Sequence, residues 1–154
     1  MKNRKAAMNN IFKITATMIL LSLSVFCTAY AHTCSPEEES QRTIEEINEE
    51  RANVGICPVC GEKHLGDCSC QRAHEVCNNF SHTRPDGSPY YTVGPDYVYG
   101  EILGRGANSS EQIVDEWMGS ECHRQEILNP NYNDVGVTVL DNGGKRYWVV
   151  EFGY

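Results

Sequence analysis

The chain has 154 residues, of which 40% are hydrophobic and 22% are charged, and its formal net charge is −8. All 21 acids but only nine of the 13 bases lie in residues 32–154, so this part carries a net charge of −12. That charge argues against nucleic acid or an anionic membrane as a partner, and a length of 123 residues fits one domain with one core.

The first 31 residues have the pattern of a secretory signal peptide. Four bases precede an apolar run over residues 18–25, and small residues end in A-x-A at residues 29–31. The apolar run is too short to span a bilayer. We therefore expect cleavage after Ala31, a location outside the cell or in the cell envelope, and no stable membrane insertion after cleavage.

Seven cysteines remain after such a cleavage, so at least one of them has no intramolecular partner. They are Cys34, Cys57, Cys60, Cys68, Cys70, Cys77 and Cys122. Outside the cytosol such a count favours disulfides, whose connectivity the sequence does not give. The run "CPVCGEKHLGDCSC" also has features of a zinc knuckle, and its first pair has the form of a redox motif.

Three helices are predicted before the last segment of the chain. Residues 32–43 form a polar lead-in and the start of a helix from Pro36 to about Asn53, with Ile44, Ile47 and Val54 on its apolar face. A second helix is expected over about residues 68–78, with residues 73, 76 and 77 facing inward. A third begins after a capping box at residues 109–112.

A short helix and a hairpin complete the predicted elements. Ser120 is placed to cap the short helix, which ends before Asn129-Pro130. Alternating apolar residues over 135–140 and 147–152 flank "DNGG", which is a strong hairpin signal. Helices followed by a terminal hairpin predict an α+β layered domain.

Two histidines and one acid are candidates for a shared site. His82 and His123 each lie at the edge of an apolar element beside small polar residues, and Glu101 lies between two glycines, where a tight turn can present a side chain to a cleft. Two imidazoles and a carboxylate are a common ligand set for zinc with open positions.

Several motifs resemble the bacterial branch of the CAP superfamily, also called the SCP or Tpx-1/allergen V5 family. They are "INEERANVG", "FSHTRPDGS", "YGEILGRGANSSEQIVDEWMGSECHR", "EILNPNYNDVGVTV" and "YWVVEFG", in that order. The resemblance implies a three-layer α–β–α sandwich with a small antiparallel sheet. The domain would cover residues 44–154, with a Cys-rich insertion at 57–70.

The resemblance also implies a cleft that can bind Zn²⁺ or another divalent cation through His82, Glu101 and His123. Ser81 and Glu121 are weaker candidates for lining the same cleft. Ile102 departs from the family pattern by replacing an asparagine, and Ser120 stands where many animal members have a second acid. Glu121 and Cys122 replace the usual Pro-Gly before His123.

Three functions are compatible with these features. The first is an extracellular binding module whose cleft holds a cation and whose ligand is a lipid, a glycan or a protein, with no catalytic residue. The second is a metal-dependent hydrolase of the peptidase type. The third is a structural component of the envelope or spore surface with a vestigial cleft. The sequence favours the first and does not give the oligomeric state.

Overall fold

The computed structural model describes residues 36–154. The predicted signal peptide, the first residues of the lead-in and Cys34 lie outside the described residues. Within the described part of the chain, no helix is both long and apolar enough to cross a membrane.

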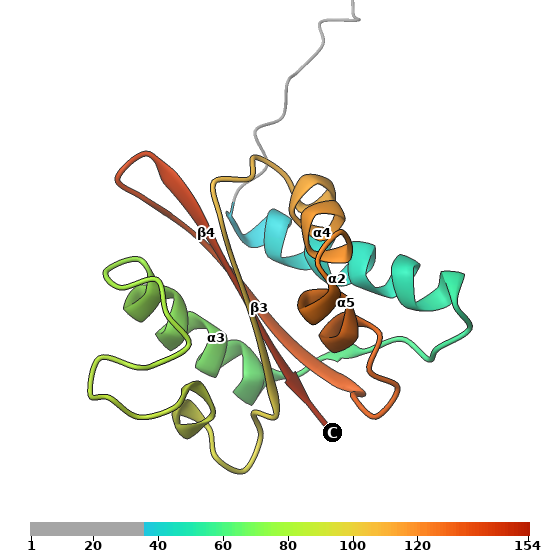
Figure 1. Cartoon of the computed structure of the whole chain (residues 1–154), viewed down its shortest axis with the longest axis horizontal. Coiled ribbons are helices and arrows are strands. Elements are labelled where there is room, and N and C mark those ends of the chain that lie inside the picture. Colours follow the sequence, from blue (N-terminus) through green and yellow to red (C-terminus); the bar gives the residue numbers. More distant parts are fainter. Residues whose placement is uncertain (1–35) are drawn as a thin grey trace, which may run out of the picture. The chain divides into compact units, whose positions relative to one another are not determined.

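A four-stranded sheet lies at the centre of the domain, in the order β1-β3-β4-β2. Strands β2 (Gly100–Arg105), β3 (Asp134–Asn142) and β4 (Lys145–Gly153) pair antiparallel, whereas β1 (Cys60–Gly61) pairs parallel with β3. Helices α2 (Pro36–Asn53), α4 (Ser110–Met118) and α5 (Glu121–Ile127) lie on one side of the sheet and α3 (Lys63–Val76) on the other (Figure 1). The α–β–α sandwich is thus confirmed, although the sheet is mixed rather than purely antiparallel.

The two faces of the sheet bury different kinds of side chain. The face toward α2, α4 and α5 is apolar, with Ile102, Trp148, Val150 and Phe152 in one core cluster with Trp117 of α4. The face toward α3 has a smaller apolar cluster, formed by Ala73, Val76, Leu103 and Val149. Because side chains alternate along a strand, Glu101 and Glu151 lie on this second face, where they are cross-strand neighbours.

The β3–β4 hairpin closes through Gly143 and Gly144. Their φ angles are 59° and 75°, which side chains larger than glycine rarely adopt. Asn142 pairs with Lys145 across this two-residue turn, so the predicted hairpin is confirmed.

Helix α2 has the predicted bounds, whereas α3 begins earlier than predicted. Lys63 starts α3 because the side chain of Glu62 accepts a hydrogen bond from the Leu65 N–H at 2.9 Å, as an N-cap does. Glutamate is not a typical capping residue, so the sequence signal was weak. Val54, predicted on the apolar face of α2, lies after the helix and is exposed. Cys77 is half-buried rather than inward-facing.

The two predicted serine caps differ in the structure. Ser109 Oγ accepts the N–H of Gln112 at 3.2 Å, which confirms the cap of α4. Ser120 stands at the N-cap position of α5, but its side chain makes no capping bond and contacts the Cys122 thiol instead. The predicted cap at Ser120 is therefore wrong.

Candidate functional site

A buried ion pair between α3 and β2 forms the base of the candidate site. Arg72 Nε lies 2.7 Å from Glu101 Oε2, and both side chains are essentially inaccessible to solvent. Gly136 allows α3 to pack this closely on the sheet, since a Cβ there would lie 2.1 Å from a backbone atom of Leu65. Glu101 lies within strand β2, so the expected tight turn at this residue is wrong.

His82 is bonded directly to this ion pair. Its Nδ1 lies 2.7 Å from Glu101 Oε1, and its side chain remains 55% exposed. Burial alone would raise the pKa of Glu101, but the hydrogen bonds from His82 and Arg72 outweigh it and the pKa is lowered. Because the ionised carboxylate only accepts hydrogen bonds, we assign a proton to His82 Nδ1; in the neutral form of the ring the lone pair is then on Nε2.

A second acid, Glu151, lies beside Glu101 on the neighbouring strand. It is fully buried, and neither of its oxygens has a hydrogen-bond partner in the described part of the chain. Burial, and then the charge of Glu101, raise its pKa well above the ordinary value. The raised pKa favours the protonated form of Glu151 beside the ionised carboxylate of Glu101.

The segment that carries His82 is held onto α3 by charged groups. Arg72 also donates to the Ser81 carbonyl at 2.7 Å and to Glu75 at 2.6 Å. Glu75 in turn pairs with Arg84 at 2.7 Å. Two arginines and one glutamate thus fix the backbone on both sides of His82.

His123 lies on the first turn of α5, in a hollow of about 270 Å³. The hollow is lined by Phe80, Leu103, Gly104, Arg105, Ile113, Glu116, Trp117, Ser120 and His123. Burial, and then the charge of His82, lower the pKa of His123. His82 is not among the described residues that line this hollow, although its charge acts on His123.

The weaker candidates lie elsewhere or are otherwise engaged. Glu121 is exposed and pairs with Arg124 on its own helix. Ser81 Oγ accepts the N–H of Thr83 at 3.0 Å. Among residues 36–154, no group of three or more His, Cys, Asp or Glu side chains is arranged to hold a metal ion.

No disulfide joins the six cysteines among the described residues of this structure. They are Cys57, Cys60, Cys68, Cys70, Cys77 and Cys122. Only Cys68 is buried, and burial raises the pKa of its thiol. The predicted disulfides and zinc knuckle therefore remain predictions.

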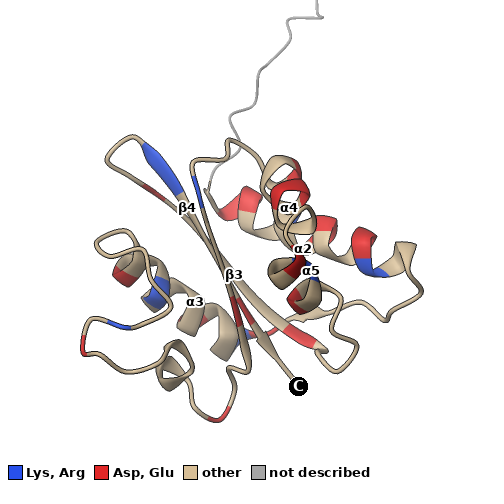
Figure 2. Ribbon diagram, in the orientation of Figure 1, with Lys and Arg blue, Asp and Glu red and all other residues tan. Residues whose placement is uncertain are grey.

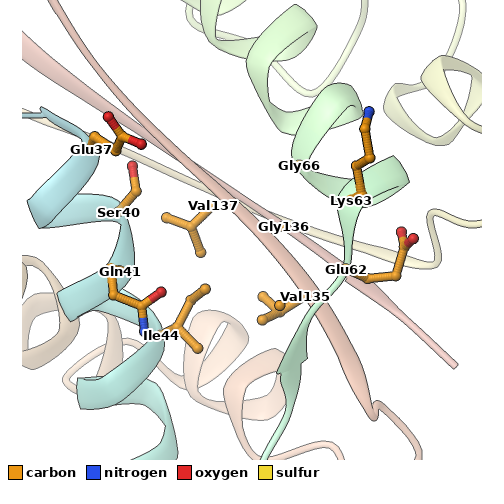
Figure 3. Close-up of a pocket in the computed structure, with 11 residues that line it drawn as sticks. Glu37, Ser40, Gln41, Ile44, Glu62, Lys63, Gly66, Val135, Gly136 and Val137 are labelled. Atoms are coloured by element: carbon orange, nitrogen blue, oxygen red, sulfur yellow. The ribbon is translucent and has the colours of Figure 1, made fainter.

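A wide groove of about 500 Å³ lies apart from the histidines, between α2 and the start of α3 (Figure 3). Val135 and Val137 of β3 line it together with Ser40 and Ile44 of α2. Beyond this groove, acidic residues are prominent along α2 and α4 (Figure 2). None of the predicted site residues is among the described residues that line it.

Reasoning from the sequence missed Arg72, Glu75, Glu116 and Glu151. Arg72 and Glu75 have the i, i+3 spacing of a helical ion pair, which was a usable signal. Glu151 interrupts the apolar part of β4 and shares a face of the strand with Val149, so a charged residue there also indicates a buried polar site.

The sequence of residues 44–152 matches the model of the CAP family, described as the cysteine-rich secretory protein family. The chain belongs to this family. YkwD of Bacillus subtilis is 31% identical over 119 residues, which are 73% of this chain and 46% of YkwD. The chain thus spans less than half the length of that relative.

Solved structures share the fold of this CAP protein. An outer surface protein from Borrelia burgdorferi superposes with a TM-score of 0.69 and 20% identity, covering 78% of this chain and 95% of the Borrelia protein. NaASP2, whose crystal structure was determined with Zn²⁺, has a TM-score of 0.60 and 13% identity, covering 80% of this chain and 82% of NaASP2.

Proposed function

We propose that this CAP protein is a secreted binding module whose cleft holds one divalent cation between the imidazoles of His82 and His123. The observation that carries the proposal is the 2.7 Å contact between His82 Nδ1 and Glu101 Oε1. It leaves Nε2 free to bind a metal, as in carboxylate–histidine–metal arrangements. The relative crystallised with Zn²⁺ and the outer-surface relative support the cation and the location.

In this proposal Glu101 positions a ligand and does not itself bind the ion. Both of its oxygens are engaged, Oε1 by His82 and Oε2 by Arg72. His82 and His123 would then supply two nitrogen ligands, and water or a group of the extracellular ligand would complete the coordination. That ligand is a lipid, a glycan or a protein, and we assign no catalytic residue.

Arg72 favours a second candidate function, a structural domain with a vestigial cleft. Its guanidinium is buried 2.7 Å from the carboxylate that orients His82. A fixed positive charge at this place opposes a divalent cation more strongly than it would in water.

Co²⁺ titration of the chain from His32 onward, under reducing conditions, tests the first proposal. Thiolate ligands give a charge-transfer band that imidazole ligands do not, so the free cysteines are separated from the cleft. We expect one imidazole-type site that His82→Ala and His123→Ala each remove. Glu101→Gln should weaken it about 10–100-fold, the usual effect of an outer-shell change.

His74→Ala is the matched control, because it removes an exposed imidazole from α3 outside the cleft. The proposal fails if His82→Ala and His123→Ala bind Co²⁺ as the parent chain does, or if the spectrum shows only thiolate ligation. Either result would leave the vestigial cleft as the better account.

A further inference from the structure

A second cavity, of about 90 Å³, contains neither His82 nor His123. It is lined by Glu62, Leu65, Asp96, Tyr97, Tyr99, Asp134, Gly153 and Tyr154. Three of these residues are tyrosines, three are acids and none is a base. We propose that this cavity binds an organic ammonium group, of which the trimethylammonium head of choline is the best probe.

The aromatic side chains give the cavity its ligand class. Tyr97 and Tyr99 are each 46% exposed and Tyr154 is 57% exposed, so their rings face solvent rather than a core. The rings of Tyr99 and Tyr154 lie 4.3 Å apart, and the imidazole of His64 stacks on Tyr97 at 4.9 Å. The π face of a tyrosine ring attracts a cation, which is how quaternary ammonium groups are recognised.

The acids at the cavity supply a matching charge. Hydrogen bonds from the backbone of His64 and Leu65 lower the pKa of Glu62 to about 2, so this carboxylate is ionised at neutral pH. Within residues 36–154, no Lys or Arg forms an ion pair with Glu62, Asp96 or Asp134. Nδ1 of His64 lies 2.8 Å from Oε1 of Glu62. This contact does not involve Asp96 or Asp134.

The size and arrangement favour a diffuse cation over a bare metal ion. About 90 Å³ exceeds the roughly 10–15 Å³ that a single water needs, so a small organic group has room. The carboxylates do not converge into a chelating set, since no metal-holding group of three occurs in the described residues. A cavity with aromatic rings and separated carboxylates is better suited to a trimethylammonium group, whose positive charge is spread over several methyl groups, than to a bare metal ion.

Choline titration followed by amide NMR shifts, with a metal chelator present, tests the proposal independently of the histidine cleft. The neutral analogue 3,3-dimethylbutan-1-ol has nearly the same shape without the charge. We expect saturable shifts around Tyr97 and Gly153 with choline and none with the alcohol. Tyr154→Ala and Asp134→Asn should each weaken choline binding about two- to fivefold, the effect of one exposed cation–π contact or charge.

Tyr91→Ala is the matched control, since Tyr91 is also 46% exposed but lies outside the cavity. It should bind choline as the parent chain does. Absence of saturable shifts, an equal response to the neutral alcohol, or equal weakening by Tyr91→Ala would each overturn the proposal. Tyr154 is 57% exposed and Asp134→Asn is nearly isosteric, so both variants are expected to fold.

Discussion

Arg51 and Arg72 are both fully buried, but their partners differ. Arg51 donates to the backbone carbonyls of Cys57, Ile127, Asn129 and Tyr132, at 2.8–2.9 Å. Arg72 pairs with the carboxylates of Glu75 and Glu101 and donates to one carbonyl. The first guanidinium joins α2 to the end of α5 and the following loop, whereas the second joins α3 to the candidate site.

The same contrast appears in their pKa values. Burial lowers the pKa of Arg51, because its partners are neutral dipoles. Burial also acts on Arg72, but Glu101 and Glu75 outweigh it and the pKa is raised. We conclude that Arg51 stabilises the fold and that Arg72 fixes the charge and geometry around His82.

The largest effect on stability is expected from Arg51→Met. Removing the guanidinium leaves four carbonyls without their donor, and each orphaned buried group costs about 1–3 kcal/mol. We expect the free energy of unfolding in urea to fall by about 4 kcal/mol or more, with no change in the position of His82. A loss below about 1 kcal/mol would show that water replaces the guanidinium at these carbonyls.

Arg72→Met should cost somewhat less, about 3 kcal/mol. Losing one partner of a buried ion pair typically costs about 3–5 kcal/mol, and here Glu101 retains His82 as a donor. The double variant Arg72→Met, Glu101→Leu should recover part of the loss, because no buried charge is then left unpaired. Equal losses in the single and double variants, measured in urea, would contradict this account of the pair.

Glu151→Gln should change how stability depends on pH. The folded-state pKa of Glu151 lies above 4.5, so folding takes up a proton and the stability of the parent chain falls as pH rises through that window. The glutamine variant takes up no proton. Its stability relative to the parent should rise by about 1.4 kcal/mol per pH unit above about pH 4.5, up to the folded pKa.

Urea unfolding at a series of pH values measures this difference. Parallel stability curves for the parent and Glu151→Gln would mean that Glu151 titrates normally in the folded chain. The expected result is a stability difference that shifts in favour of Glu151→Gln by about 1.4 kcal/mol per pH unit as pH rises from about 4.5.

The smallest expected effect on stability is the difference between Ser109→Ala and Ser120→Ala. Ser109→Ala should cost about 1 kcal/mol, because it removes an observed N-cap bond. Ser120→Ala should change stability by less than about 0.5 kcal/mol, since Ser120 makes no such bond. Equal costs by thermal unfolding would contradict the difference between the two helix starts.

Local signals predicted those elements in which sequence and packing agree. The capping box at Ser109, the Gly143–Gly144 hairpin and the helix from Pro36 to Asn53 follow from residue types a few positions apart. The start of α3 depends on an atypical local cap, Glu62, and the strand at Glu101 depends on tertiary pairing, so the usual local patterns did not give them. β2 in particular exists because residues 100–105 pair with 147–152.

The candidate site was predictable only in part for the same reason. The motifs singled out His82, Glu101 and His123, and the structure joins His82 to Glu101 directly. Arg72 and Glu151 left only local signals, which did not point to Glu101. Glu101 lies 29 residues from Arg72 and on a different strand from Glu151. Ion pairs between residues far apart in the chain produce no periodic pattern in the sequence, so the partners of Glu101 could not be predicted from it.

The proton position on His82 tests the central claim most directly. ¹⁵N NMR of the histidine side chains, recorded without metal at about pH 8 to keep an unperturbed imidazole neutral, distinguishes the two tautomers. We predict a proton on Nδ1 and a lone pair on Nε2, and a shift toward equal tautomer populations in Glu101→Gln. A proton on Nε2 in the parent chain would contradict the claim that Glu101 orients His82 for a cation.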